Sequence, residues 1–253
     1  MDIPYEPVLF DTKLNIHLIL EYLAFFVGFR YYVRLRKKSN DSISSLNRLS
    51  IIIGAVFGAL FLSRGMAFLE NPPLHATQGI LALLNNKTIM GGLFGGLLGV
   101  ELAKKIIGEK QSSGDLFTLP LILGIGIGRL GCFLSGTHEF TYGTETTFFL
   151  GMDLGDGLLR HPTSLYELVF LFFLFMGIKK LQHYSDQLEN GTLFKVFMLA
   201  YFGFRFAIEF IKPNTFLFLG LSSIQYLCLI CFGYYYKTIG KAIQYANKKL
   251  HLL

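Results

Sequence analysis

The sequence predicts an all-α, polytopic integral membrane protein with about seven transmembrane helices. The chain has 253 residues, of which 52% are hydrophobic and only 16% are charged, whereas soluble domains carry about 25% charged residues. Its apolar stretches are about 20 residues long, a length that fits a hydrocarbon core about 30 Å thick. Its basic residues concentrate in alternate connections between these stretches, a bias typical of cytoplasmic loops.

Seven apolar segments are long enough to be expected as spans. The first apolar segment is expected to be a retained span and not a cleaved signal, because the polar and acidic start MDIPYEPVLFDTKLN is unlike a signal peptide. Segment 76–84 is too short to cross and is expected to lie at the interface or to re-enter. We expect a single transmembrane domain, 1–253, with an outer loop at about 136–160 and a short basic tail from 237. The expected spans are 15–34, 50–69, 89–107, 115–135, 162–178, 192–211 and 215–236.

The distribution of Lys and Arg predicts the orientation of the chain. Most of them lie in the connections 34–49, 103–114 and 179–195 and in the tail from 237. The opposite side carries only Lys13, Lys87, Arg160 and Lys212. The positive-inside rule therefore places the N-terminus outside and the C-terminus in the cytoplasm. The net charge of +6 is a topology signal with some attraction to anionic headgroups, and it does not indicate a nucleic-acid partner.

Glycines and cysteines indicate packing. The stretch MGGLFGGLLG repeats the GxxxG spacing at Gly91, Gly92 and Gly95, a spacing that lets helix backbones approach closely in lipid. Cys228 and Cys231 form a CxxC pair without neighbouring cysteines or histidines, so we interpret them as packed or lipid-facing residues. No disulfide framework is expected from three cysteines.

Three arginines lie deep in expected spans. Arg129 stands within the apolar stretch GIGIGRLGCFLSG, and Arg64 and Arg205 lie at a similar depth in their segments, whereas Arg30 is near a span end and can snorkel. A charge at the bilayer centre costs at least about 2.5–3.5 kcal/mol, so each cation needs compensation. Glu209 follows Arg205 by one turn and is expected to neutralise it. The other two arginines suit an anionic lipid phosphate, which a guanidinium binds in a bidentate fork.

The expected outer loop and the start of the fifth span gather acidic residues and histidines at one mouth of the bundle. Pro162 fits the first turn of that span, and Glu167 falls about one turn inside it. His138, Glu139 and His161 offer metal-ligand atoms, but their spacing matches no common zinc pattern. No metal site is therefore expected.

Three short motifs, IGRLGCFLSG, HPTSLYE and YFGFRFAIEF, resemble in order and separation those of the prolipoprotein diacylglyceryl transferases. The resemblance runs weakly from about residue 15 to 236. It implies that the chain transfers the diacylglyceryl group of phosphatidylglycerol to the lipobox cysteine in the signal peptide of a prolipoprotein. It also implies a seven-span enzyme of the bacterial inner membrane, with its active site toward the outer leaflet and without metal or nucleotide.

The resemblance assigns site residues position by position. Arg129 matches the arginine of the family signature GRxGNFxNGE. Arg205 and Glu209 match the arginine and the glutamate of the family segment FRxxVEF. The remaining matches imply substrate-binding roles for Arg64, Tyr201, His161, Tyr166 and Glu167, and for Glu139 just beyond the signature.

Several positions depart from the family pattern. Cys132 and Ser135 replace the two signature asparagines, and Thr137 replaces the glutamate that follows. Met90 stands where the family carries a histidine proposed as a base, and Glu21 stands where it carries a functional tyrosine. The phosphate-binding residues are therefore kept, while those that activate the acceptor thiol are changed.

His17 and Glu21 are a candidate replacement for the missing base. They are four residues apart, so they share one face of the first helix. We hypothesise that His17 takes the proton of the acceptor while Glu21 orients it. A structural histidine that merely pairs with the carboxylate is the alternative.

Three functions remain open on the sequence. The first is diacylglyceryl transfer to prolipoproteins. The second is a family paralogue that keeps the phospholipid site but modifies another acceptor or runs a different lipid reaction. The third is a non-catalytic lipid-binding membrane protein.

Overall fold

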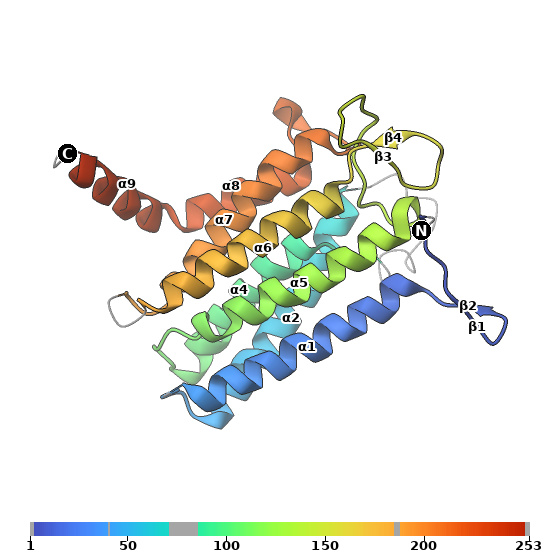
Figure 1. The fold of residues 1–253 in the computed structure, drawn as a ribbon. Coiled ribbons are helices and arrows are strands. Elements are labelled where there is room, and N and C mark those ends of the chain that lie inside the picture. Colours follow the sequence, from blue (N-terminus) through green and yellow to red (C-terminus); the bar gives the residue numbers. More distant parts are fainter. Residues whose placement is uncertain (1–2, 40, 71–85, 185–187, 251–253) are drawn as a thin grey trace. The chain divides into compact units, whose positions relative to one another are not determined.

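The computed structural model describes residues 3–39, 41–70, 86–184 and 188–250, and over these ranges the chain is mostly helical (Figure 1). The α-helices are α1 (Ile16–Lys38), α2 (Ser45–Glu70), α4 (Ile89–Ile107), α5 (Asp115–Ser135), α6 (Thr163–Gln182), α7 (Thr192–Ile208), α8 (Ser223–Tyr234) and α9 (Tyr236–Leu250). Short 3₁₀ turns occur at Gly136–His138, Glu209–Ile211 and Phe218–Gly220. Two antiparallel pairs of two-residue strands join β1 (Val8–Leu9) to β2 (Thr12–Lys13) and β3 (Met152–Asp153) to β4 (Leu159–Arg160).

Six of the seven expected segments coincide with observed helices, with ends that differ by at most five residues. The seventh, 215–236, differs because the α-helix begins only at Ser223. The side chain of Ser222 accepts a hydrogen bond from the N–H of Gln225, and the Gln225 side chain accepts one from the N–H of Ser222. This capping box starts the helix. Just upstream, Leu219 has a left-handed φ of 59°, which an α-helix cannot contain.

Within the described residues, three helical segments are long and apolar enough to cross a membrane: Ile16–Lys38, Ser45–Glu70 and Asp115–His138. α8 is apolar but shorter. Large apolar side chains on α1, such as Tyr22, Phe25 and Phe26, are exposed, as expected of a lipid-facing surface. The count of seven spans and their orientation stay predictions, and segment 76–84 lies outside the described residues.

The described chain divides into two compact units. Unit 1 comprises Met1–Ser42, Ser112–Phe194 and Phe210–Pro213. Unit 2 comprises Ile43–Gln111, Lys195–Glu209 and Asn214–Leu253. The single transmembrane domain stays a prediction.

In unit 1, α5 packs against both α1 and α6, and the three helices lie side by side (Figure 1). The rings of Tyr32 on α1 and Phe117 on α5 stack with centroids 4.3 Å apart. The contact continues to the far end of α5, where a Cβ at Gly131 would meet His17 Cα at 3.4 Å. Glycine at 131 therefore lets the start of α1 approach α5 closely.

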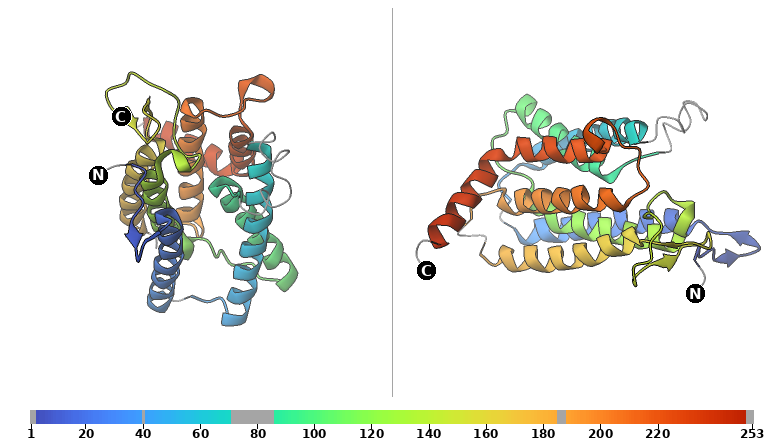
Figure 2. Two further views of the ribbon diagram at one scale, coloured as in Figure 1. Left: turned by 90° about the vertical axis from the view of Figure 1, so that its right-hand side faces the viewer. Right: turned by 90° about the horizontal axis from the view of Figure 1, so that it is seen from above.

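Unit 2 is built on the antiparallel pair α2 and α4, seen from two further directions in Figure 2. A Cβ on Gly54 would lie 2.6 Å from the carbonyl oxygen of Gly99, and one on Gly91 would lie 2.5 Å from that of Leu62. Between them, a Cβ on Gly58 would collide with the carbonyl oxygen of Gly95. The GxxxG glycines therefore serve packing, as the sequence predicts. α8 packs against both helices of this pair.

Gly58→Ala should destabilise unit 2 by about 1–3 kcal/mol, because the added methyl group forces the two backbones apart. Thermal unfolding in detergent, followed by circular dichroism, measures the effect. Gly65→Ala on the same helix is the matched control, because nothing lies within 4 Å of its Cβ position. Equal melting temperatures for both variants would show that the close approach contributes nothing.

Candidate functional site

The cationic centre of unit 1 is Arg129, which is only 6% exposed. Its Nε lies 2.8 Å from Oε1 of Glu167, and the Glu167 side chain is 1% exposed. The two residues come from α5 and α6, so the packing of these helices brings the opposite charges together. A buried ion pair of this kind avoids the cost of an uncompensated charge in apolar surroundings.

This pairing corrects the expectation that Arg129 lacks a protein carboxylate. The sequence predicts Glu209 as the counter-ion of Arg205, and the resemblance implies a substrate-binding role for Glu167. Glu167 is 38 positions away in the printed sequence, and no local spacing connects the two. The charge of Arg129 is therefore compensated within unit 1.

A thiol, an imidazole and a carboxylate form a chain of contacts beside Arg129. Sγ of Cys132 lies 3.5 Å from Nε2 of His17. Nδ1 of the same ring lies 3.3 Å from Oε1 of Glu139. Nη1 of Arg129 donates to Sγ of Cys132 over 3.9 Å. The residues come from the start of α1, the last turns of α5 and the loop after α5, all within unit 1.

The carboxylate recorded beside His17 Nδ1 is that of Glu139, where the sequence hypothesis expects Glu21. Glu21 is one turn further along α1. From the sequence, Cys132 was identified only as the replacement of a signature asparagine, and no contact with His17 was predicted. The signal available was its spacing from Arg129, because residues i and i+3 share a helix face.

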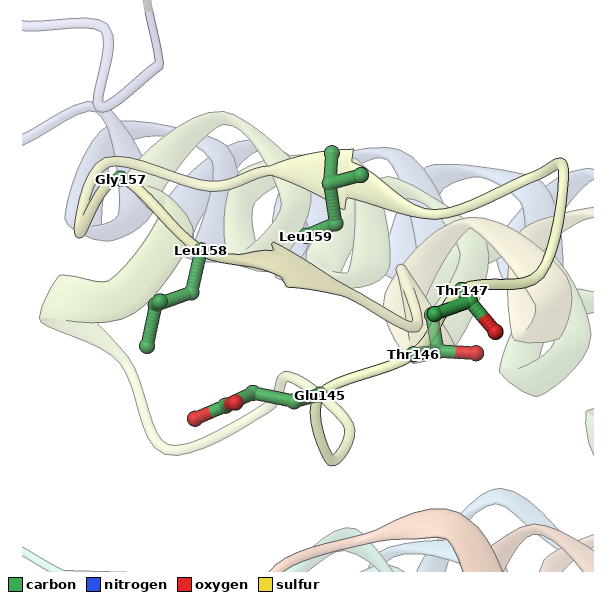
Figure 3. Close-up of a pocket in the computed structure, with 6 residues that line it drawn as sticks. All are labelled: Glu145, Thr146, Thr147, Gly157, Leu158 and Leu159. Atoms are coloured by element: carbon green, nitrogen blue, oxygen red, sulfur yellow. The ribbon is translucent and has the colours of Figure 1, made fainter.

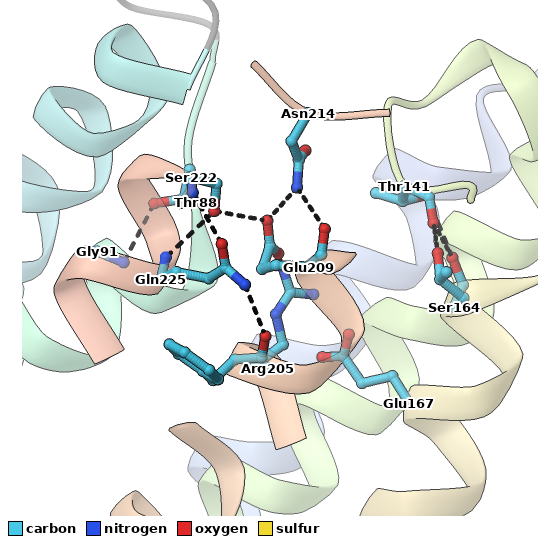
Figure 4. A network of polar contacts seen from close by, with 12 residues as sticks. Thr88, Gly91, Thr141, Ser164, Glu167, Arg205, Glu209, Asn214, Ser222 and Gln225 are labelled. Atoms are coloured by element: carbon cyan, nitrogen blue, oxygen red, sulfur yellow. Dashed lines mark hydrogen bonds and ion pairs between the residues drawn. The ribbon is translucent and has the colours of Figure 1, made fainter. Parts of the chain in front are cut away.

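The outer loop is anchored to the start of α6. Oγ1 of Thr163 donates to the Thr141 carbonyl oxygen at 2.6 Å, and Oγ of Ser164 donates to the same oxygen at 3.0 Å (Figure 4). Pro162 occupies the N-cap position, one residue before the first helical turn. Nδ1 of His161 lies 3.2 Å from the hydroxyl oxygen of Tyr166. His161 and Tyr166 are thus brought together, whereas the carboxylate of Glu167 contacts Arg129.

The hairpin β3–β4 forms the tip of this loop. A surface depression of about 610 Å³ lies there, lined by Glu145, Thr146, Thr147, Gly157, Leu158 and Leu159 (Figure 3). None of these was predicted as a site residue. The hydrogen bond from Arg160 Nε to Asp156, 2.7 Å long, holds the pKa of that carboxyl below its usual range.

The residues considered for a metal site are engaged separately. His138 lies 3.8 Å from Glu6, Glu139 contacts His17, and His161 contacts Tyr166. Across the ranges 3–39, 41–70, 86–184 and 188–250, no three His, Cys, Asp or Glu side chains gather as metal ligands.

The polar centre of unit 2 is the pair Arg205–Glu209. Nη2 of Arg205 donates to Oε1 of Glu209 at 2.5 Å, which confirms the pairing predicted from their i,i+4 spacing. Both are buried. Ser222 Oγ donates to Oε2 of Glu209 at 3.3 Å, and Nδ2 of Asn214 donates to the same atom (Figure 4). Hydrogen-bonded on both oxygens, the carboxylate is held in one orientation.

Other predicted site residues of unit 2 differ in their surroundings. Tyr201 is fully buried on α7 and stacks on Phe197, with centroids 5.9 Å apart. Met90 is 1% exposed at the start of α4. Arg64 is half-buried on α2, and no hydrogen bond or ion pair joins its side chain to another residue in the described part of the chain. The predicted phosphate site shared by Arg129 and Arg205 stays a prediction, because these residues belong to different units.

The buried arginines and their carboxylates lie within a segment that matches a known family. The family model described as prolipoprotein diacylglyceryl transferase matches residues 7–237. The chain belongs to this family. The matched range contains every predicted site residue, from His17 to Glu209, and the resemblance seen in the sequence is confirmed.

Curated relatives carry the name phosphatidylglycerol–prolipoprotein diacylglyceryl transferase. One from Wolbachia sp. subsp. Brugia malayi is 30% identical over 70% of this chain and 66% of its own length. One from Wolbachia pipientis subsp. Culex pipiens is 32% identical over 75% of this chain and 76% of its own length. One from Bordetella parapertussis is 32% identical over 72% of this chain and 69% of its own length.

Glu167→Gln should destabilise unit 1 by about 3–5 kcal/mol, because it removes the carboxylate charge that faces a buried guanidinium. Glu145→Gln is the control, since Glu145 is 65% exposed and 3.9 Å from Arg160; it should cost less than about 1 kcal/mol. Unfolding in detergent measures both. The double variant Arg129→Met/Glu167→Leu should lose less stability than the two single changes together, and strict additivity would contradict the pairing.

Proposed function

We infer that the chain transfers the diacylglyceryl group of phosphatidylglycerol to the lipobox cysteine thiol of prolipoproteins. The observation that carries this conclusion is membership of the family over residues 7–237, a range that includes both buried arginine–glutamate pairs. The reaction is a group transfer. The thiolate of the acceptor attacks the diacylglyceryl carbon, the bond from that carbon to the phosphate oxygen breaks, and glycerol phosphate leaves.

In unit 1, Arg129 binds the phosphate and stabilises the charge that develops on the leaving group. The ion pair with Glu167 supports this role because it holds the guanidinium in place. His17 takes the proton of the acceptor thiol. The contact of Nδ1 with Glu139 supports that role, since it orients the ring and stabilises the imidazolium. Glu21, on the same helix, adds negative charge beside the ring, and His161 and Tyr166 contact the substrate.

In unit 2, Arg205 binds phosphate, and Glu209 orients the Arg205 side chain. The hydrogen bonds that Glu209 accepts from Arg205, Asn214 and Ser222 support this division of roles. Arg64 adds a third cation for the phospholipid headgroup. Tyr201 completes this side of the substrate site.

The proposed setting is the bacterial inner membrane, which supplies both phosphatidylglycerol and the prolipoprotein signal peptide. The reaction centre faces the outer leaflet, and seven helices cross the membrane with the N-terminus outside. The basic connections 34–49, 103–114 and 179–195 support this orientation.

A second candidate function is a paralogous lipid reaction with another acceptor. One observation favours it: the thiol of Cys132 occupies a signature asparagine position and contacts His17. A preparation that consumes phosphatidylglycerol without modifying a lipobox peptide would support this alternative.

Arg129→Ala should lower the rate of diacylglyceryl transfer by about 10²–10³-fold, because a fixed charge stabiliser is lost. The purified protein is incubated in detergent with phosphatidylglycerol and a lipobox peptide, and the thioether product is quantified by mass spectrometry. Arg30→Ala is the control, since Arg30 is exposed on α1, and it should leave the rate unchanged. A wild-type protein that forms no thioether would overturn the proposed function.

His17→Ala should lower the same rate by about 10²-fold at neutral pH, because the acceptor thiol loses its base. The deficit should shrink above a pH of about 8.5, where a free cysteine ionises without help. His183→Ala, at the C-terminal end of α6, is the control for a histidine outside the site. A deficit that is constant across the pH range would rule out the base role of His17.

A further inference from the structure

The contacts of Cys132 have a chemical meaning beyond the transfer reaction. Both ring nitrogens of His17 are engaged, with Nε2 at 3.5 Å from the thiol sulfur and Nδ1 at 3.3 Å from the Glu139 carboxylate. A nucleophile within hydrogen-bonding reach of a base, with the base oriented by a third group, is the arrangement of covalent catalysis. In diacylglyceryl transfer the nucleophile is the thiol of the acceptor. The transfer reaction therefore does not use the thiol of Cys132.

Two nitrogen-bearing side chains lie close to the sulfur of Cys132. The guanidinium of Arg129 lies 3.9 Å from the sulfur, and the ring of His17, 3.5 Å away, becomes a second cation once it has taken the proton of the thiol. Neighbouring cations activate a cysteine by stabilising its thiolate. Cys132 is 6% exposed, while the side chain of His17 is 20% exposed, so the base can exchange its proton with the surroundings.

The other two cysteines differ from Cys132. Cys228 and Cys231 are fully buried in α8. In the described part of the chain, neither sulfur takes part in a hydrogen bond or ion pair. They therefore provide matched internal controls for reactivity.

The position of the cluster along its helices indicates the kind of electrophile. Cys132 is three residues before the end of α5 at Ser135, or about 4.5 Å along the helix axis. His17 is the second residue of α1. Both helices belong to segments long enough to span a membrane, so the cluster lies near the boundary between hydrocarbon and headgroups. The acyl ester carbonyls of glycerolipids lie at this boundary.

We propose that Cys132, His17 and Glu139 form a second reaction centre, in which the thiol of Cys132 takes an acyl chain from a glycerolipid ester. His17 Nε2 removes the proton from Sγ, and the sulfur attacks the ester carbonyl carbon. The ester C–O bond then breaks, and His17 returns the proton to the departing lysolipid alcohol. The product is a thioester on Cys132, which water or an amine cleaves to regenerate the thiol. No electron transfer is involved.

This chemistry is distinct from diacylglyceryl transfer. Diacylglyceryl transfer breaks the bond to the phosphate oxygen, leaves both acyl esters intact and forms a thioether. The proposed reaction breaks an acyl ester and forms a thioester, so the two adducts differ in mass and in stability toward hydroxylamine.

The test is incubation of the purified, detergent-solubilised full chain with dioleoyl-phosphatidylglycerol, followed by intact-protein and peptide mass spectrometry. We expect a mass increase of one oleoyl chain on Cys132, release of that mass by neutral hydroxylamine, and at least an equal amount of lysophosphatidylglycerol. His17→Ala should form the adduct at least about 10²-fold more slowly. Cys228→Ala should form it at the wild-type rate.

Three results would overturn the proposal: no acyl adduct, an adduct that resists hydroxylamine, or an adduct on Cys228 or Cys231. Cys132→Asn, which restores the family's residue, should abolish the acyl adduct, and its melting temperature checks folding. The lipobox-peptide assay runs in parallel on the same preparation. A protein that modifies the peptide but gains no acyl chain contradicts only this inference. A protein that acylates Cys132 but leaves the peptide unmodified contradicts only the proposed transfer function.

Discussion

The pairing of buried guanidinium groups with carboxylates is the constraint on which the polar organisation of this chain depends. An isolated charge among apolar helices is strongly disfavoured, and each unit meets this demand in its own way. In unit 1, Glu167 reaches Arg129 from the neighbouring helix. In unit 2, Glu209 reaches Arg205 from one turn along the same stretch, with Asn214 and Ser222 completing its hydrogen bonds. The pairs hold the cations at fixed positions, which their proposed roles in phosphate binding require.

The fixed position of Arg129 also organises the groups around it. The same side chain that meets Glu167 directs Nη1 to the sulfur of Cys132. Gly131 lets α1 come close enough for His17 to reach that sulfur, and the loop after α5 supplies Glu139. Charge compensation, helix packing and the contact of His17 with Cys132 are therefore consequences of the same local arrangement of α1, α5 and α6.

The departures from the family signature gain a physical interpretation from this arrangement. Replacing a signature asparagine with Cys132 introduces a thiol beside an imidazole and a guanidinium. At the family's histidine position, Met90 packs with its side chain almost fully buried. Under the proposed function, the chain keeps the arginines of the family and uses His17 as its base.

The sequence by itself determined the helical character, the bounds of most helices and the family, because these follow from composition, apolar periodicity and short motifs. It also determined the Arg205–Glu209 pair, because residues four apart on one helix are neighbours in any tertiary arrangement. The shortened α8 was missed because a capping box at Ser222 and Gln225 outweighed apolar length. Only the tertiary structure decided the Arg129–Glu167 pair and the contact of Cys132 with His17, residues 115 positions apart. Their meeting depends on which helix faces pack together, and local spacing carries no information about that choice.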